Sequence, residues 1–270
     1  MIEDGKGEYA FMVLYFTGTG NSLYVAKKLD DVRLSIPQII HEEKREYEAD
    51  RIGIVCPIYG HEMPEMVKQF IRQTVFHTDY FYIVLTYGKL HGGAAELADK
   101  YLKDCGIEAD YINTIMMVDN YLPAFDMNEQ LAIDPEKKVD EHIAEIKKDI
   151  ESQKRWKQKA KLKDQVCHQM YLKMRNENPI DVKGGIFRVL DHCIGCGICM
   201  RVCPTGSIRV ENQHAQYKDT SRCQMCLACV QHCPENAIRL TIPEKNPNAR
   251  YHNGNIRLSE IVEANNQNNY

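Results

Sequence analysis

Residues 193–204 read CIGCGICMRVCP, and residues 223–234 repeat their spacing as CQMCLACVQHCP. In both stretches three cysteines stand three positions apart, a fourth follows four positions later, and a proline comes next. Eight of the chain's eleven cysteines belong to this repeat: Cys193, Cys196, Cys199, Cys203, Cys223, Cys226, Cys229 and Cys233. So many thiols in two matching loops predict a metal-binding module with two related halves.

The C-x2-C-x2-C-x3-C-P spacing is typical of loops that bind [4Fe–4S] clusters. Three thiolates of one tight loop reach three corners of an iron–sulfur cube, and the fourth, turned away by the proline, ligates the cluster of the other loop. We therefore predict two clusters with an exchanged ligand. The first cluster takes Cys193, Cys196, Cys199 and Cys233, and the second takes Cys223, Cys226, Cys229 and Cys203. Structural zinc is disfavoured, because its four ligands usually come as two separated pairs.

The composition is that of an ordinary globular protein, with 44% hydrophobic and 27% charged residues. At 270 residues the chain has room for two domains. A net charge of −4 argues against nucleic-acid binding, which needs clustered positive surface. No apolar run approaches the roughly 18 residues of a membrane span, so no membrane is expected as a partner. Thiols that must stay reduced favour a cytoplasmic location.

Residues 9–118 alternate short apolar runs with helical patterns, which predicts an α/β fold. Five strands are expected near 9–16, 33–36, 51–58, 79–86 and 110–117, and helices near 20–30, 62–76 and 92–105. Several of these strands are apolar almost throughout, as in a parallel sheet that helices cover on both faces. The connection 39–50 is short for a crossover helix, which leaves the place of the second strand open.

We expect four segments along the chain. These are an α/β domain at 1–126, a charged helical linker at 127–183, a cysteine-rich domain at 184–242 and a C-terminal tail, extended or loosely docked, at 243–270. Within 129–178, Val139, Ile143, Ile146 and Ile150 have the spacing of a helix that packs along one face. The six basic residues of 154–163 fit either a solvated helix face or a docking surface for an acidic redox partner.

The loop after the first strand reads Thr17-Gly18-Thr19-Gly20-Asn21-Ser22 and opens a helix. Backbone N–H groups and hydroxyls in such a loop can bind a phosphate, and the helix dipole assists. The loop lacks the Gly-Lys-Ser/Thr of a P-loop, and it does not follow G-x-G-x-x-G. Neutral donors without a lysine or arginine fit a monoester phosphate best, and an ordinary helix cap is the alternative.

Two further loops follow the third and fourth strands: Pro57-Ile58-Tyr59-Gly60 and Thr86-Tyr87-Gly88. The carboxyl ends of parallel strands meet at one edge of a sheet, and ligands of such sheets bind there. Tyr59 and Tyr87 are therefore placed to flank a flat aromatic ring.

This combination resembles a known family, the fusions of a flavodoxin-like domain with a two-cluster bacterial ferredoxin. The stretch 15–22 is similar to the flavodoxin loop that binds the FMN phosphate, which implies that role for Thr17, Gly18, Thr19, Gly20, Asn21 and Ser22. The loops 57–60 and 86–88 are similar to the two that embrace the isoalloxazine ring, and Asn120 lies in a segment that these fusions carry near the flavin. The resemblance implies FMN, a doubly wound five-stranded parallel flavodoxin-like sheet and a C-terminal α+β ferredoxin-like domain with two [4Fe–4S] clusters.

We expect an electron-transfer protein, because FMN exchanges electrons singly or in pairs while each cluster passes one. Its partner is a redox protein or a small-molecule electron donor or acceptor. The alternatives are a flavin-dependent reductase of a small organic substrate and a binding module whose flavodoxin-like domain is empty. His61, His91 and Asp126 could serve a proton transfer, but exposed loop residues are the simpler interpretation. The sequence leaves open the donor, the acceptor and the oligomeric state.

Overall fold

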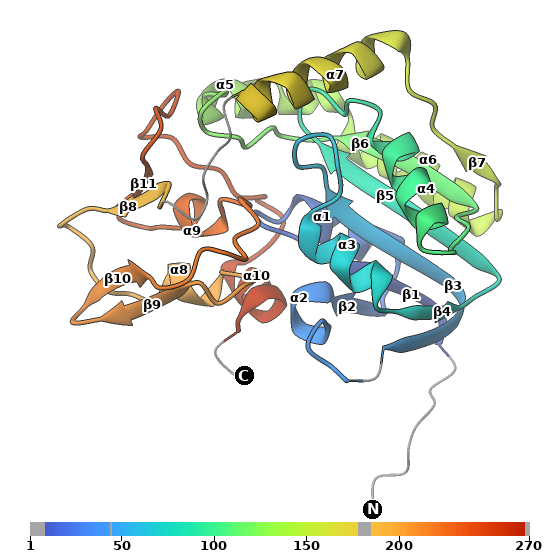
Figure 1. The fold of residues 1–270 in the computed structure, drawn as a ribbon, viewed down its shortest axis with the longest axis horizontal. Helices are drawn as coiled ribbons and strands as arrows, with labels where there is room; N and C mark the ends of the chain where they lie inside the picture. Colours follow the sequence, from blue (N-terminus) through green and yellow to red (C-terminus); the bar gives the residue numbers. More distant parts are fainter. Residues whose placement is uncertain (1–8, 44, 178–184, 268–270) are drawn as a thin grey trace, which may run out of the picture.

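The computed structural model describes residues 9–43, 45–177 and 185–267. Figure 1 shows two bodies side by side: an α/β unit around one sheet, and a smaller cysteine module, which we define as residues 185–242. Beyond the module, the chain returns to the α/β unit through helix α10 (Leu258–Asn265). The boundary between the two bodies is therefore formed by the α/β unit, the cysteine module and the chain that follows the module.

One sheet forms the centre of the α/β unit. Its strands are β1 (Tyr9–Tyr15), β2 (Arg33–Ser35), β3 (Glu46–Pro57), β4 (Val75–His77), β5 (Tyr80–Tyr87), β6 (Tyr111–Met116) and β7 (Trp156–Lys157). They lie in the order β2-β1-β3-β5-β6-β7, and β4 pairs with β3. All of these pairings are parallel. The carboxyl ends of β1, β3 and β5 therefore meet at one edge of the sheet.

All five predicted strands are present, but the sheet has seven strands in the described part of the chain, so the expected count of five was wrong. β4 pairs with residues 46–48, at the start of β3, which begins earlier than predicted. β7 adds two residues to the outer edge of β6. Both strands are too short to show a periodic pattern, and they form where a neighbouring strand offers unpaired backbone groups. β2 lies at the opposite edge, beside β1, so the short 39–50 connection leads back past β1 to β3.

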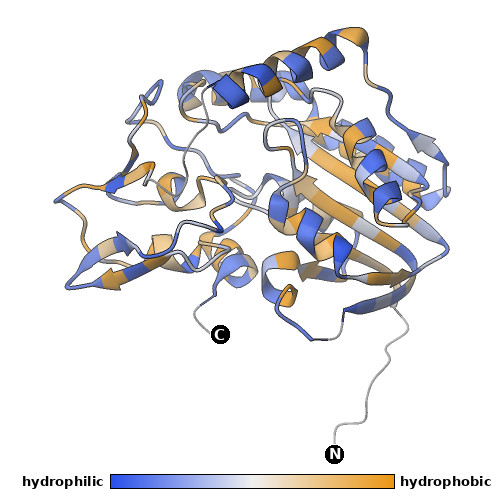
Figure 2. Cartoon of the chain, in the orientation of Figure 1, coloured by the Kyte–Doolittle hydropathy of each residue, from blue (hydrophilic) through white to orange (hydrophobic). Residues whose placement is uncertain are grey.

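Apolar side chains cover both faces of the sheet, as the unbroken apolar runs predicted. In β1, Met12 and Leu14 point to one face, and Val13 and Tyr15 point to the other. Helices α2 (Ile36–Ile39), α3 (Glu65–Arg72) and α4 (Ala94–Asp104) cover the first face. Helices α1 (Asn21–Leu29) and α6 (Val139–Glu151) cover the second. Figure 2 shows the hydrophobic colour concentrated in the central strands.

The charged helical stretch predicted for 129–178 is only partly helical. Residues 129–177 contribute to five elements, which are α5 (Met127–Ala132), a 3-10 helix η1 (Asp134–Lys137), α6, β7 and α7 (Leu162–Glu177). The apolar stripe forms α6, where Ile143, Ile146 and Ile150 are buried against the sheet. The apolar spacing stops after this helix, and Gln153 takes a left-handed backbone conformation that prevents the helix from continuing. Residues expected to be a linker thus contribute a helix and an edge strand to the α/β unit.

The basic residues of 154–163 do not line one helix face, because β7 runs through this stretch. Several of them form ion pairs with acidic residues of the α/β unit. Arg155 lies 3.4 Å from Asp110, and Lys157 lies 2.7 Å from Asp99. These pairs attach the stretch to the sheet beside β6 and α4.

The cysteine module consists of two similar halves. Its strands β8 (Phe187–Val189) and β11 (Ile238–Leu240) pair antiparallel, and so do β9 (Ile208–Glu211) and β10 (His214–Tyr217). Each cysteine loop leads into a short helix, α8 (Ile198–Arg201) or α9 (Ala228–Gln231). The halves share one apolar core, which includes Ile208, Val230 and Ile238. The module is therefore an α+β unit, as expected.

Residues 243–267 form a docked segment rather than the extended or loosely docked tail that the composition of 243–270 predicted. Helix α10 contacts α2 of the α/β unit and α8 of the module. Its residues Ile261 and Ala264 are buried in the same apolar layer as α1. One asparagine of this segment has a partner in the α/β unit: the side chain of Asn265 donates to the carbonyl of Thr17 at 2.9 Å.

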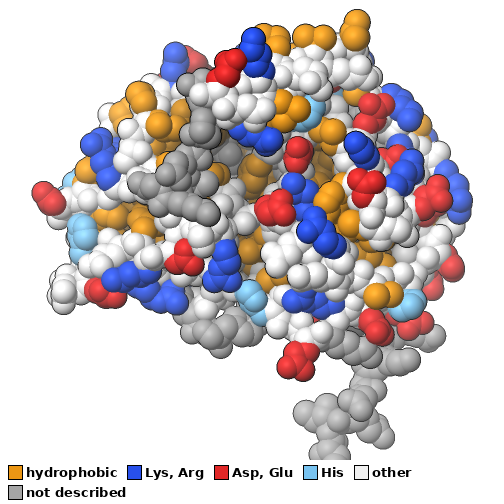
Figure 3. Space-filling model, in the orientation of Figure 1, with side chains coloured by type: hydrophobic (Ala, Val, Ile, Leu, Met, Phe, Trp, Pro, Cys, Tyr) orange, Lys and Arg blue, Asp and Glu red, His pale blue; other side chains and the backbone are white. Residues whose placement is uncertain are grey.

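The surface carries charges of both signs. Figure 3 shows acidic and basic side chains interspersed over the visible face. In the described part of the chain, no helix combines the length and the apolarity needed to cross a membrane.

Replacing Ile146 by alanine tests whether α6 belongs to the core of the α/β unit. The side chain is 3% exposed, and such a change at a buried site costs about 2–5 kcal/mol through lost burial and the cavity left behind. We expect the free energy of unfolding to fall by about 3 kcal/mol, measured by urea denaturation with circular dichroism. Glu145→Ala, on the exposed face of the same helix, is the control and should change it by less than about 0.5 kcal/mol. Equal stability of the two variants would contradict the packing of α6 on the sheet.

Candidate functional site

The two cysteine loops share a backbone conformation as well as a spacing. Gly195 and Gly197 are left-handed, with φ of 65° and 74°. The matching positions, Met225 and Leu227, are left-handed too, with φ of 53° and 57°. This conformation is easy for glycine and strained for methionine or leucine, so the second loop keeps its shape against a local preference. The shape, rather than the residue types, is what the site requires.

The causes of the pKa shifts of Cys199 and Cys229 indicate which thiols lie close together, and they divide the eight cysteines of the repeat into two sets. Burial, with a smaller contribution from neighbouring thiols, raises the pKa of Cys199 to about 12. These neighbours are Cys196, Cys233 and Cys193. Burial also raises the pKa of Cys229 well above its usual value, with further contributions from Cys203, Cys226 and Cys223. Each set includes the fourth cysteine of the other loop, which is the grouping that exchanged ligation needs.

Backbone N–H groups donate to the fourth cysteine of each loop. The N–H of Ser207 donates to Cys203 Sγ at 3.4 Å, and the N–H of Ala237 donates to Cys233 Sγ at 3.2 Å. In both halves the donor stands four residues after the cysteine. Such donors stabilise negative charge on a cluster sulfur, so they favour the reduced cluster.

A cavity lies inside the first set of thiols. Its lining comprises Cys193, Cys196, Cys199 and Cys233 with small or apolar neighbours such as Ile194, Gly195 and Pro234. Among the described residues, no three His, Cys, Asp or Glu side chains converge on one point as ligands of a single ion do. A cubane needs its four sulfurs spread around a cavity, and the residues present fit that requirement.

The predicted phosphate loop lies buried at the carboxyl end of β1. Of the backbone N–H groups of residues 17–22, that of Gly20 has a partner among the described residues, the hydroxyl of Thr17 at 3.1 Å. The other five have none there, and they belong to Thr17, Gly18, Thr19, Asn21 and Ser22. We call these five the open N–H groups. Buried donors without an acceptor are rare, and several at a helix N-terminus suit an anion such as the phosphate of FMN.

Side chains of the loop are held by the surrounding strands. Ser22 Oγ and Thr86 Oγ1 lie 2.8 Å apart, which joins the loop to the end of β5. The hydroxyl of Thr19 accepts a hydrogen bond from the side chain of Asn120 and keeps its own proton to donate. The side-chain amide of Asn21 donates to a backbone carbonyl after β6 at 3.2 Å. The backbone, more than the side chains, therefore offers donors to a ligand.

Residues that the sequence did not single out hold this loop from behind. The backbone N–H of Asn253 donates to the carbonyl of Thr19 at 2.8 Å, and Asn265 donates to that of Thr17. A Cβ on Gly20 would lie 3.0 Å from the Cβ of Asn253. The signal in the sequence was a high asparagine content, and composition does not say which partner an amide meets.

The other predicted loops also lie at the carboxyl ends of the strands, beside the phosphate loop. Pro57 pairs with Thr86 at the ends of β3 and β5, and the N–H of Ile58 donates to the Thr86 carbonyl at 2.8 Å. Asn120 follows β6 and reaches the phosphate loop through Thr19. The structure thus brings together all the loops that the sequence assigned to a flavin.

Glycines let other side chains approach the two tyrosine loops. A Cβ on Gly60 would lie 2.2 Å from the hydroxyl of Tyr171 on α7. A Cβ on Gly88 would lie 2.1 Å from the Cβ of Asp119. Burial, followed by the nearby cysteine thiols, raises the pKa of Tyr59 well above its usual value. Side chains from several elements therefore cover the carboxyl ends of the strands, where the flavin ring is expected.

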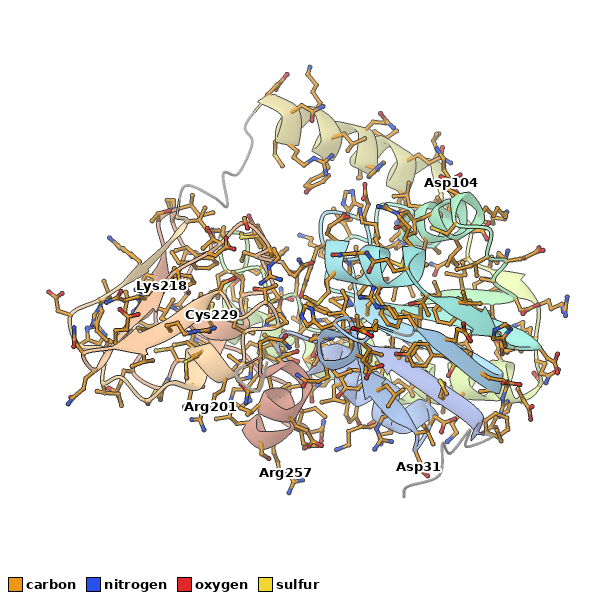
Figure 4. The ribbon with its side chains drawn as sticks, turned by 60° about the horizontal axis from the view of Figure 1, so that its bottom comes forward. Asp31, Asp104, Arg201, Lys218, Cys229 and Arg257 are labelled. Atoms are coloured by element: carbon orange, nitrogen blue, oxygen red, sulfur yellow. The ribbon has the colours of Figure 1, made fainter. Side chains whose placement is uncertain are left out.

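The cysteine module touches the phosphate loop directly. A Cβ on Gly18 would lie 2.8 Å from the carbonyl oxygen of Cys226 and 3.3 Å from the hydroxyl of Tyr59. Nearby, the N–H of Met66 on α3 donates to the side chain of Gln224 at 2.9 Å. Figure 4 shows Cys229, which belongs to the same set of thiols, within the module. The second set therefore lies against the loop expected to bind a phosphate.

Residues 185–234 match the family model of the 4Fe-4S dicluster domain. This match agrees with the chemistry expected of the cysteine repeat. No curated protein matches the chain in sequence.

Several solved structures align with part of the chain, among them the following three. The Trp repressor binding protein from Bacillus subtilis aligns over 39% of this chain and 83% of its own, at 13% identity and a TM-score of 0.28. A putative flavoprotein from Bacteroides uniformis aligns over 46% and 96%, at 15% identity and a TM-score of 0.30. Rubredoxin oxygen:oxidoreductase from Desulfovibrio gigas aligns over 52% and 37%, at 10% identity and a TM-score of 0.30. Because these TM-scores are low, we draw no conclusion from the alignments. The description of the fold rests on the strand order of the sheet.

Gly18→Ala tests the contact between the module and the phosphate loop. The added methyl would meet the backbone of Cys226, which cannot turn aside as a flexible side chain can. We expect the free energy of unfolding to fall by about 1–3 kcal/mol, which should lower the unfolding temperature measured under anaerobic conditions. Gly254→Ala is the matched control, because nothing lies within 4 Å of its added methyl. Equal unfolding temperatures for the two variants would show that the contact is looser than described.

Tyr217→Phe tests a hydrogen bond to a predicted cluster ligand. The Tyr217 hydroxyl donates to Cys229 Sγ at 3.1 Å, and its ring stacks on Phe187 with centroids 4.9 Å apart, which phenylalanine preserves. Losing this donor disfavours the reduced cluster, so its potential should fall by about 40 mV, roughly 1 kcal/mol for one electron. An anaerobic redox titration followed by EPR measures it, with Tyr47→Phe in the α/β unit as control. A potential equal to that of the control would mean that the hydroxyl does not tune the site.

Proposed function

We propose that this chain is an electron-transfer protein that holds FMN and two [4Fe–4S] clusters. The contact of Cys226 with Gly18 carries the proposal, because it brings a predicted cluster ligand against the loop with the open N–H groups. The order β2-β1-β3-β5-β6 supports the flavin part, since it follows the 2-1-3-4-5 order of doubly wound flavodoxin-like sheets. The family match over 185–234 supports the cluster part.

Each part of the chain has one task in this proposal. The open N–H groups bind the phosphate, Tyr59 and Tyr87 flank the ring, and the eight repeat cysteines hold the clusters. Bound FMN supplies exchange of one or two electrons, whereas each cluster passes one at a time. The chain then joins one-electron carriers to a two-electron donor or acceptor. Cluster ligands that must stay reduced favour the cytoplasm as its location.

We infer an order for the two clusters. The second set of thiols lies against the phosphate loop through Cys226. In the first set Cys196 is exposed, and the neighbouring Ile194 is 57% exposed. A redox protein or a small electron carrier therefore reaches the first cluster, and the second cluster lies between that cluster and the flavin loop.

The cover over the tyrosine loops favours a carrier over a reductase of a small organic substrate. Cys226 approaches Gly18 and Tyr59 from the module, and α7 brings Tyr171 against Gly60. A substrate would need open space over the ring, whereas an electron can cross packed atoms.

Cofactor analysis after anaerobic purification tests the proposal. We expect about eight irons and about one FMN per chain, with flavin absorption above the broad absorbance of the clusters. Cys226→Ser should lower the iron content by about four and leave the FMN in place. Cys105→Ser, outside the repeat, is the control and should keep all the iron.

Two results would contradict the proposal. Eight irons without FMN, even after FMN is added, would remove the flavin part. Zinc in place of iron would remove the cluster part.

A further inference from the structure

Three histidines and an aspartate gather where the tyrosine loops meet α7. His61 and His91 come from the loops after β3 and β5, and Asp164 and His168 come from α7. Their loop positions predict exposure for His61 and His91, but both are partly buried, and the side chain of His91 is 14% exposed. Asp126, the third residue with a possible role in proton transfer, caps α5 instead.

His61 and His168 form a close imidazole pair. Their Nδ1 atoms lie 3.3 Å apart, which is within hydrogen-bond distance, and their ring centroids lie 5.5 Å apart. One nitrogen of such a pair must carry a proton, and the other must accept it. Burial lowers the pKa of His61, and positive charge on His168 and His91 lowers it further. A positive charge on His168 therefore disfavours a second one on His61.

The backbone holds His61 in this position at a local cost. His61 is left-handed, with a φ of 71°, and Gly60 before it has a φ of 58°. A Cβ on Gly92 would lie 2.2 Å from the His61 ring, so a glycine is needed there. A left-handed conformation is uncommon for residues other than glycine, and it persists where the surrounding structure imposes it, often at functional sites.

His91 and Asp164 extend the group along α7. The N–H of Gly93 donates to His91 Nδ1 at 3.2 Å, so the neutral ring carries its proton on Nε2. That nitrogen lies 3.7 Å from Asp164 Oδ1. The ring of His91 also meets Tyr87 edge-on, with centroids 5.3 Å apart. Other titratable groups that face the two loop histidines are Glu62, Lys161, Lys163 and Tyr171.

We propose that the His61–His168 pair is a proton relay to the flavin expected at the tyrosine loops, an inference that rests on the proposed function. Two electrons that arrive there would leave two negative charges among buried groups, where unpaired charge is costly. Two protons neutralise them. Each reduced cluster gives up one electron and returns to its oxidised state, and the pair passes each proton inward and regains it from solvent. One oxidised flavin, two electrons and two protons thus yield one dihydroflavin.

A first test follows the pair itself, by nitrogen-15 NMR of histidine-labelled protein with its clusters oxidised. We expect His61 to titrate below the ordinary histidine range in the native chain. His168→Gln removes its positive neighbour, so the pKa of His61 should rise. An unchanged titration of His61 in this variant overturns the pair. A metal ion bound beyond the cluster iron, and lost in the variant, overturns it as well.

A second test measures flavin reduction by stopped flow after mixing with reduced methyl viologen. His61→Asn is the informative variant, because asparagine tolerates the left-handed backbone. We expect reduction at pH 8 to slow about 100-fold with unchanged iron and FMN, and imidazole buffer to restore it. His142→Gln, on the exposed side of α6, is the control and should react as fast as the native chain.

The outcomes separate this inference from the proposed function. An unchanged rate in His61→Asn with normal FMN content overturns the proton relay and leaves electron transfer standing. A slow rate that imidazole does not restore also overturns it, since it indicates a structural role. A native chain that retains no FMN overturns both, whatever the NMR titration shows.

Discussion

The arrangement of this protein depends on one close contact, that of the Cys226 backbone with Gly18. Because Gly18 has no side chain, the second cysteine loop can approach the end of β1 to a distance that any other residue would prevent. The same loop of β1 carries the open N–H groups at the start of α1. The contact therefore brings a predicted cluster ligand and a predicted phosphate site together through backbone atoms, which are less free to move than side chains.

The chain that follows the cysteine module reinforces this contact. The side chain of Gln231 on α9 donates to the carbonyl of Asn120 at 2.9 Å and accepts from the N–H of Tyr251 at 2.8 Å. Tyr251 in turn donates its hydroxyl to the side chain of Asn21 in the phosphate loop. Each such buried hydrogen bond contributes about 1 kcal/mol and leaves a costly unpaired group when one partner is lost. The phosphate loop is thus held by the second half of the module and by the chain that follows it.

How well each site could be predicted depends on how local its geometry is. A cluster loop places three thiols within a few residues, so spacing alone carries its chemistry. The phosphate loop is equally local, because it needs a strand, a short turn and the start of a helix. β4 and β7 were missed because two or three residues show no periodicity. The stripe of α6 predicted a buried face without indicating what covers it.

By itself, the sequence determined the two cysteine loops, the existence of five of the strands and the position of the phosphate loop, since each depends on spacing within a short stretch. Only the tertiary structure decided that Cys226 meets Gly18, that Asn253 and Asn265 support the loop, and that His61 pairs with a residue 107 positions away. These contacts join side chains that are distant in the chain. They follow from how helices pack on a sheet and on a second body, and no local pattern of residues encodes that packing.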